Sequence, residues 1–232
     1  MMPSLPDGYR ALVFGASGAI GQALCHQLQI DPRCASVVGL SRDSVPGFDL
    51  YSEPRIAACA QAVAASGPFH VMLDATGALT LNGRGPEKRL DELDAEHLLN
   101  ALHLNAVGPS LLLKHFVPLL ASGERVIWGK LSARVGSIED NRKGGWYGYR
   151  AAKAALNMLL QTAAVEIARR RPLAVVAALQ PGTVQSALSQ PFVGDDALQP
   201  KDAAQRLLAV LDALPAMGRA QFVDHLGQHI PW

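Results

Sequence analysis

The feature that most constrains the fold is a glycine-rich turn near the start of the chain. Residues 9–14 end in an apolar run that predicts a buried strand, and residues 22–28 predict a helix. Between them lies Gly15-Ala16-Ser17-Gly18-Ala19-Ile20-Gly21. In such a unit the glycines allow a tight turn, close approach of a pyrophosphate and close helix packing, with the phosphates over the helix N-terminus. The turn predicts a dinucleotide site; the alternative is a turn that is merely small and flexible.

The rest of the chain alternates between strand and helix patterns. Short turns join the elements, which is typical of a parallel sheet covered on both faces. We therefore predict a single α/β domain over residues 1–232, a Rossmann-type doubly wound sheet with helices on both faces. The predicted strands are 36–40, 69–74, 125–128, 173–179 and 220–223; the predicted helices are 53–65, 93–120 (interrupted near residues 108–109 and at 118) and 200–214, with a surface loop at 79–89.

Composition argues against several classes of protein. The chain has 21 Lys and Arg against 20 Asp and Glu, so no basic face for nucleic acid is predicted. Lys114, His115 and Pro118 interrupt the most apolar stretch, so no membrane span is expected, and the first residues do not resemble a signal peptide. The three cysteines include no close pair that would hold a metal, and we expect reduced thiols in a cytoplasmic protein.

The residues after the second predicted strand bear on the choice of dinucleotide. An acidic side chain at this position would bind the ribose 2′-hydroxyl of NAD, but the chain has Ser41 followed by Arg42. A hydroxyl beside a guanidinium suits the 2′-phosphate of NADP. Asp43 follows directly, and an exposed arginine is common in loops. NADP(H) is favoured on this pattern, and NAD(H) stays possible.

A tyrosine and a lysine four residues apart suggest proton-transfer chemistry. The alanine-rich run from Arg150 onward favours a helix, which would place Tyr149 and Lys153 on one face. A nearby ammonium favours phenolate, so it would lower the pKa of the tyrosine and let it exchange a proton near neutral pH. The alternative is an exposed pair on a helix surface.

Several motifs in the same order resemble the short-chain dehydrogenase/reductase family over nearly the whole chain. The residues from 131–138 and 146–150 are similar to the branch of C-factor and sniffer-type carbonyl reductases, and the ending, 224–232, is similar to it as well. The matching motifs are the glycine-rich turn at 15–21, Phe48-Asp49-Leu50, Asn105, the Tyr149-x-x-x-Lys153 pair and Pro181-Gly182.

The resemblance implies hydride transfer between a nicotinamide ring and a carbonyl carbon. Tyr149 would donate the proton, Lys153 would lower its pKa and hold the nicotinamide ribose, and Asn105 would hold a water that links Lys153 to solvent. A serine would stabilise the substrate oxygen. Aligned on Gly136, its usual position falls at Ala133, so Ser132 is the first choice and Ser137 the competitor. For Asn105, the alternative is a helix residue that bonds nearby backbone.

The resemblance also implies a set of cofactor contacts. Two departures affect it: the middle glycine is Gly18 rather than a glycine at Ala19, and Asp74-Ala75-Thr76-Gly77 replaces Asn-Asn-Ala-Gly. The segment after Pro181-Gly182, where the family places its substrate lid, is short and contains Leu188, Phe192 and Val193, which suggests an open, apolar-walled site. The expected contacts are Gly15, Ser17, Gly18, Ala19, Ile20, Gly21, Ser41, Arg42, Asp49, Leu50, Ala75, Thr76, Gly77, Tyr149, Lys153, Pro181, Gly182, Thr183, Val184 and Ser186. For Gly182, Thr183 and Ser186, a plain loop is the alternative at about even odds.

The sequence thus predicts an NAD(P)-dependent oxidoreductase that reduces an aldehyde or ketone with NADPH. The alternative is a C-factor-like sensor or signalling protein that binds the dinucleotide with little or no turnover. We expect a small carbonyl or alcohol as substrate, no resident metal, and a homodimer or homotetramer.

Overall fold

The computed structural model describes residues 2–44, 46–185 and 197–232. At its centre is a six-stranded sheet in the order β2-β1-β3-β4-β5-β6, and every neighbouring pair is parallel. This order, with the crossover after β2, confirms the predicted doubly wound α/β sheet. The strands are β1 (Tyr9–Phe14), β2 (Cys34–Leu40), β3 (Val71–Asp74), β4 (Val126–Leu131), β5 (Ala174–Gln180) and β6 (Ala220–Asp224).

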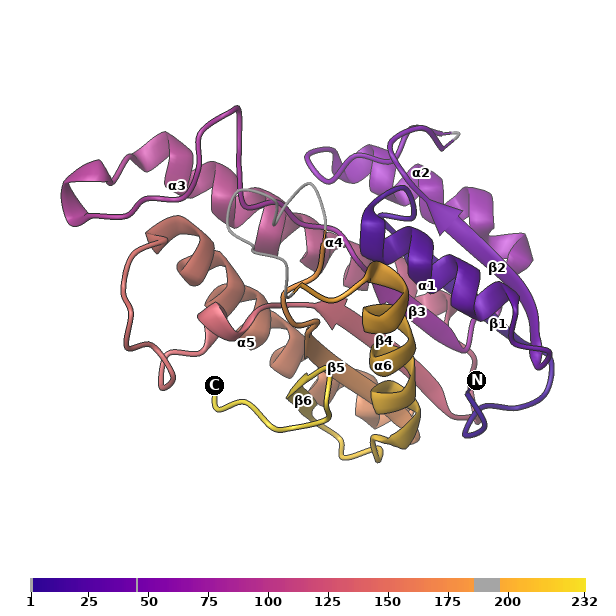
Figure 1. The fold of residues 1–232 in the computed structure, drawn as a ribbon. Helices are drawn as coiled ribbons and strands as arrows, with labels where there is room; N and C mark the ends of the chain where they lie inside the picture. The colour runs from indigo at the N-terminus through magenta and orange to yellow at the C-terminus, as the bar shows by residue number, and fades with distance from the viewer. Residues whose placement is uncertain (1, 45, 186–196) are drawn as a thin grey trace.

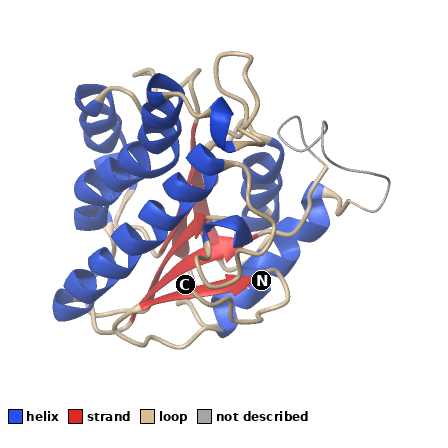
Figure 2. Ribbon diagram, turned by 90° about the vertical axis from the view of Figure 1, so that its left-hand side faces the viewer, coloured by secondary structure: helices blue, strands red, loops and turns tan. Residues whose placement is uncertain are grey.

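Helices cover both faces of the sheet (Figures 1 and 2). Helices α1 and α6 pack against each other on one face, and α2, α4 and α5 lie on the other. No helix among the described residues has the length and apolar character needed to cross a membrane. The helices are α1 (Ala19–Gln29), α2 (Glu53–Val63), α3 (Ala95–Leu102), α4 (Gly108–Phe116), α5 (Tyr147–Arg170) and α6 (Pro200–Ala213), with short helical turns η1 (Ala64–Ser66), η2 (Leu90–Glu92), η3 (His103–Val107), η4 (Val117–Leu119) and η5 (Arg134–Gly136).

The central strands are buried on both faces, so their side chains alternate between two apolar cores. In β4, Trp128 belongs to the core under α2, α4 and α5, whereas Ile127 belongs to the core under α1 and α6. This alternation places Lys130, two residues after Trp128, on the α5 face of the sheet. A charged residue in such a strand is unusual, since all six residues of β4 are buried.

The predicted helix over 93–120 is interrupted directly before Gly108 and again at Pro118, which lies in the short turn η4, as the sequence indicated. Gly108 and Pro109 form the first turn of α4, directly after the irregular turn. The irregularity is the π-helical turn η3, His103–Val107. It contains Asn105, which is fully buried.

The loop predicted to lie on the surface at 79–89 is partly buried, which corrects the sequence-based expectation. Leu79, Leu81 and Glu87 are 5%, 7% and 2% exposed. The loop packs beneath the start of α5, where Trp146 donates its backbone N–H to the carbonyl oxygen of Glu87. The polar, glycine-rich composition suggested full exposure. The loop is instead partly buried because Leu79 and Leu81 pack inside the protein and the start of α5 covers Glu87.

Candidate active site

A cleft of about 690 Å³ runs along the carboxyl ends of β1, β2 and β3. Parallel strands end at the same edge of a sheet, so the loops that follow them meet there. Ten of the expected cofactor contacts line this cleft: Gly15, Ser17, Gly18, Ser41, Arg42, Asp49, Leu50, Ala75, Thr76 and Gly77.

The glycine-rich turn has the geometry that a pyrophosphate requires. Gly15 has a φ of +75°, a conformation that side chains disfavour, and Gly18 is the N-cap of α1 without a side-chain cap. A side chain at Gly21 would collide with the carbonyl oxygen of Gly15, so only glycine lets helix and strand pack this closely. The first turn of α1 carries no acidic residue. Its N–H groups are therefore available to an anion.

Two arginines line the same cleft at the loop after β2 and at α2. Arg42 was expected from the sequence, but Arg55 was not; its guanidinium lies 3.4 Å from the position that a side chain at Gly47 would take. Neither arginine forms an ion pair with any residue in the part of the chain that the structure describes. Two free guanidinium groups beside Ser41 suit a phosphate.

Tyr149 and Lys153 both lie on α5, one helical turn apart, as the sequence predicted. The Nζ atom of Lys153 is 5.5 Å from the centre of the Tyr149 ring and donates a hydrogen bond of 3.0 Å to the carbonyl oxygen of Leu131. Gly77 connects this pair with the cleft, because a side chain there would reach within 3.5 Å of Lys153 Nζ. Lys153 therefore lies close to Gly77, which lines the cleft, although neither member of the Tyr–Lys pair is itself a lining residue.

Residues 32–212 match the family model described as enoyl-(acyl carrier protein) reductase. That match covers well over half of the chain and includes the Tyr–Lys pair. The chain belongs to the short-chain dehydrogenase/reductase family. It is therefore an oxidoreductase that acts on alcohol or carbonyl groups and binds a nicotinamide dinucleotide, and its relatives support the resemblance to the C-factor and sniffer-type branch.

The relatives and the solved structure described below cover between 72% and 98% of this chain. C-signal of Myxococcus xanthus is 30% identical over 72% of this chain and 95% of its own. A 1-hydroxy-2-glutathionyl-2-methyl-3-butene dehydrogenase of Rhodococcus sp. (strain AD45) is 28% identical over 95% of this chain and 98% of its own. The NADPH-bound carbonyl reductase from chicken fatty liver shares the fold, with a TM-score of 0.84 at 20% identity over 98% of this chain and 95% of its own.

Burial dominates the electrostatics of the Tyr–Lys pair. It raises the pKa of Tyr149 to about 12 and holds the pKa of Lys153 well below its usual range. The direction for Tyr149 is opposite to the one that the sequence predicted, because burial disfavours the charged phenolate. At neutral pH the tyrosine is a phenol, which is the form that can donate a proton.

Asn105 joins the π-helical turn η3 to the loop after β3. Its Nδ2 donates to the carbonyl oxygens of Ala101 (3.1 Å) and Ala78 (3.0 Å), and its Oδ1 accepts the N–H of Ala78 at 3.1 Å. Asn105 therefore bonds nearby helix backbone, as the structural alternative for this residue predicts, and it also fixes the loop that contains Gly77. Its role in a water relay stays a prediction.

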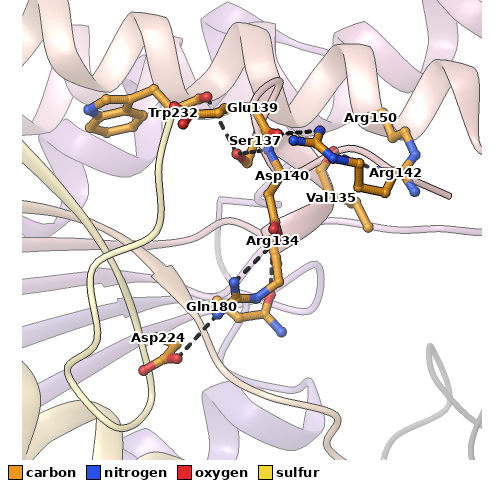
Figure 3. A network of polar contacts seen from close by, with 10 residues as sticks. All are labelled: Arg134, Val135, Ser137, Glu139, Asp140, Arg142, Arg150, Gln180, Asp224 and Trp232. Carbon is orange, nitrogen blue, oxygen red and sulfur yellow. Dashed lines mark hydrogen bonds and ion pairs between the residues drawn. The ribbon is translucent and has the colours of Figure 1, made fainter. Parts of the chain in front are cut away.

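The hydroxyl groups of Ser132 and Ser137 have protein partners. Ser132 is 4% exposed and donates to Oδ1 of Asn157 on α5 at 2.7 Å. The Ser137 hydroxyl accepts the N–H of Asp140 (3.0 Å) and donates to the carbonyl oxygen of Trp232 (3.4 Å), as Figure 3 shows. Which serine serves the substrate stays a prediction, and Ser132 would have to exchange Asn157 for the substrate oxygen.

The segment after Ser132 is braced by a polar network (Figure 3). Arg134 donates its backbone N–H to the side chain of Gln180 and pairs with Asp140 at 3.3 Å and Asp224 at 3.4 Å. Arg150, next to Tyr149, donates to the carbonyl oxygens of residues 135, 144 and 145. These bonds join the ends of β5 and β6 to the start of α5.

The remaining expected contacts lie away from the lining of the cleft. Ala19, Ile20 and Gly21 begin α1 behind the turn, and Gly182 has a φ of +80° and packs against His225. Val184 is buried and forms a bridge with Leu198. Ser186, Leu188, Phe192 and Val193 lie outside the described residues. The expected contacts of Pro181, Gly182, Thr183 and Val184 stay predictions.

Two buried charged residues beside the site were not singled out from the sequence. Glu87, in the loop that packs against the start of α5, accepts the N–H of Gly148 at 3.0 Å, directly before Tyr149. Lys130 and Asp74 form an ion pair in which both side chains are 1% exposed. Lys130 lay beyond the strand predicted at 125–128, which the structure extends to Leu131, and nothing near Glu87 distinguished it from a polar loop residue.

Proposed function

We propose that this dehydrogenase/reductase catalyses the NADPH-dependent reduction of an aldehyde or ketone to an alcohol. The observation that carries the proposal is the position of Lys153, whose Nζ is 5.5 Å from the centre of the Tyr149 ring and would be 3.5 Å from a side chain at Gly77, a residue that lines the cleft. When bound, NADPH supplies the hydride for the carbonyl carbon. Tyr149 gives its proton to the carbonyl oxygen, Lys153 stabilises the phenolate that forms, and solvent returns the proton.

Two features of the chain's own residues fit NADPH in the cleft. The glycine turn and the uncapped start of α1 fit the pyrophosphate. Arg42 and Arg55 fit the 2′-phosphate because both line one cleft and neither has an ion-pair partner among the described residues. The preference for NADP over NAD is thus proposed on charge, with Ser41 as a further polar contact.

We propose a single domain over residues 1–232, because all six strands belong to one sheet. A small carbonyl compound is the proposed substrate class. The cytoplasmic location expected from three reduced thiols stays a prediction, and Cys25, Cys34 and Cys59 are free cysteines in the structure.

A second candidate is a dinucleotide-binding protein with little turnover. The bonds of Ser132 and Ser137 favour it, because both hydroxyls are already used within the protein. The match to C-signal, whose name describes a signal and not an enzyme, is compatible with it. An intact Tyr149–Lys153 pair argues for catalysis, since a pure binding protein has no need of a proton donor.

The test is consumption of NADPH and NADH with a panel of aldehydes, ketones and quinones. Tyr149→Phe keeps the ring and removes the proton, so it should bind NADPH as the wild type does and lose about 10²- to 10⁴-fold in kcat. NADPH bound tightly but consumed with no member of the panel would favour the second candidate. Equal turnover by Tyr149→Phe would exclude Tyr149 as the acid.

A further inference from the structure

A second lysine lies buried beside the reacting pair. Lys130 on β4 is opposite Asp74 on β3 in the sheet register, and the distance from its Nζ to Asp74 Oδ1 is 3.0 Å. Both side chains are 1% exposed. The family motifs noted in the sequence do not include Lys130, and Asp74 lies where the family motif has Asn.

Lys130 and Asp74 together hold Thr76. Lys130 Nζ donates to the carbonyl oxygen of Thr76 at 2.6 Å and to its hydroxyl at 3.1 Å. Asp74 Oδ1 accepts the Thr76 N–H at 2.8 Å and its hydroxyl at 2.5 Å. All three donors of the ammonium are thereby used. Because Thr76 and Gly77 line the cleft, the pair sets the shape of the cofactor-facing turn.

The same pair lies next to Lys153. Lys130 is on the α5 face of the sheet, and Lys153 binds the carbonyl oxygen of the very next residue, Leu131. After burial, the repulsion from Lys130 is the next cause that lowers the pKa of Lys153, and Asp74 opposes it. Among the described residues, these two groups and Tyr149 are the ionisable side chains that face Lys153; Asn105, from η3, carries no charge.

Stability alone is a weak reason for this pair. Removing two charges from water is costly, and apolar residues of similar volume often replace a buried ion pair without loss. In addition, Asp74 Oδ2 is buried without a hydrogen-bond partner among the described residues. An imperfectly satisfied ion pair at the edge of an active site suggests that its charges serve the reaction.

We propose that Lys130, paired with Asp74, is a positioning residue that holds the Thr76–Gly77 turn against the cofactor and sets the electrostatic field at Lys153 and Tyr149. The inference rests on the proposed function. Lys130 touches neither substrate nor reacting atoms, and it acts through Thr76 and Lys153.

The first test is the pH dependence of kcat/KM for alcohol oxidation, which requires the phenolate. Lys130→Met leaves the Asp74 charge uncompensated and disfavours phenolate, so the apparent pKa should rise. Asp74→Asn keeps Oδ1 and the side-chain shape but leaves the Lys130 charge, so the apparent pKa should fall. We expect opposite shifts on the order of half a unit or more, and a Lys130→Met/Asp74→Asn double variant should return toward the wild type.

The second test is NADPH and NADH affinity by fluorescence titration, which needs no turnover. Lys130→Met should weaken both cofactors about tenfold, because the turn that it holds does not read the 2′-phosphate. Lys114→Met is the matched control: it breaks an ion pair with Glu53 that is also short, 2.6 Å, but lies on the surface. It should leave both affinities and the pH profile unchanged.

The outcomes separate the two proposals. The proposal is overturned if the apparent pKa of the two variants does not shift, or shifts in the same direction, while the cofactor affinities are unchanged. Lys130 would then be a structural residue only, even if the Lys130→Met variant melts at a lower temperature. If Lys130→Met does not fold, an unshifted profile in Asp74→Asn overturns the role just as well. If the wild type consumes no NADPH at all, the proposed function fails, and the affinities alone decide whether Lys130 holds the turn.

Discussion

Charge at single residues determines how the cleft would choose between two nearly identical cofactors. Arg42 and Arg55 differ from the other arginines of the site, because Arg134 and Arg150 are used in the network of Figure 3. An unpaired guanidinium gains a strong, charge-assisted bond when a phosphate arrives. The same guanidinium gains little from the 2′-hydroxyl of NAD.

Arg42→Ala and Arg55→Ala should each raise KM for NADPH about ten- to hundredfold and change KM for NADH by less than about threefold, since a hydrogen bond to a charged group is worth about 1.5–3 kcal/mol. Steady-state kinetics with both cofactors would check this. An equal loss for NADH would mean that the arginine acts on the fold of the loop and does not read the phosphate.

The two serines should respond differently to removal of their hydroxyls. Ser132→Ala leaves Oδ1 of buried Asn157 without its donor, and Nδ2 of Asn157 already lacks a partner among the described residues. We expect a loss of about 1–3 kcal/mol in the free energy of unfolding. If Ser132 also serves the substrate, kcat falls more than about tenfold.

Ser137→Ala supplies the comparison, because its hydroxyl bonds only backbone groups. Its kcat should stay near that of the wild type. A larger loss of kcat in Ser137→Ala than in Ser132→Ala would reverse the assignment of the active-site serine.

At the scale of elements, the start of α5 is the part on which the chemistry depends most. Tyr149 lies in its first turn, and the N-cap Trp146 has a left-handed conformation with a φ of +55° and no side-chain cap. Glu87 compensates from another loop, with its carboxylate on the N–H of Gly148. A negative charge at this end also suits the helix dipole.

Glu87→Gln keeps the shape and one acceptor but removes the charge at the start of α5. We expect a loss of about 1–2 kcal/mol in stability, and a fall in kcat greater than the change in KM for the cofactor. Chemical denaturation and steady-state kinetics would measure both. Glu166→Ala, an exposed change on the same helix, should alter neither quantity, and an equal effect of the two variants would contradict the role of Glu87.

At the scale of the whole molecule, apolar side chains remain exposed on neighbouring helices. Leu99 on α3 and Met158 on α5 are each 66% exposed, and Val165 on α5 is 40% exposed. Helices α3 and α5 pack side by side. Such residues are candidates for the contact surface of the homodimer or homotetramer that we predict.

Light scattering at micromolar concentration should therefore show a mass of two or four chains. Met158→Glu would bury a charge in that interface and should shift the protein toward the monomer. Leu226→Glu, a similar change at a residue 59% exposed beyond β6, is the control. A monomeric wild type would contradict the prediction.

The sequence alone was enough for the parts of this protein that local patterns determine. The alternation of strands and helices, the turn from Gly15 to Gly21 and the four-residue spacing of Tyr149 and Lys153 depend on neighbours in the chain, and the structure has each of these features. A strand, a glycine turn and a helix follow from backbone sterics and periodicity within about twenty residues.

Only the tertiary structure decided which side chains meet across distant segments. Arg55 joins Arg42 in the cleft, Lys130 reaches Thr76, and Glu87 reaches the start of α5, over separations that no local pattern encodes. The pKa of Tyr149 likewise depended on burial, which outweighs the nearby lysine. Local sequence patterns therefore predict the fold and the Tyr149–Lys153 pair. Desolvation and long-range packing determine the electrostatic environment of that pair.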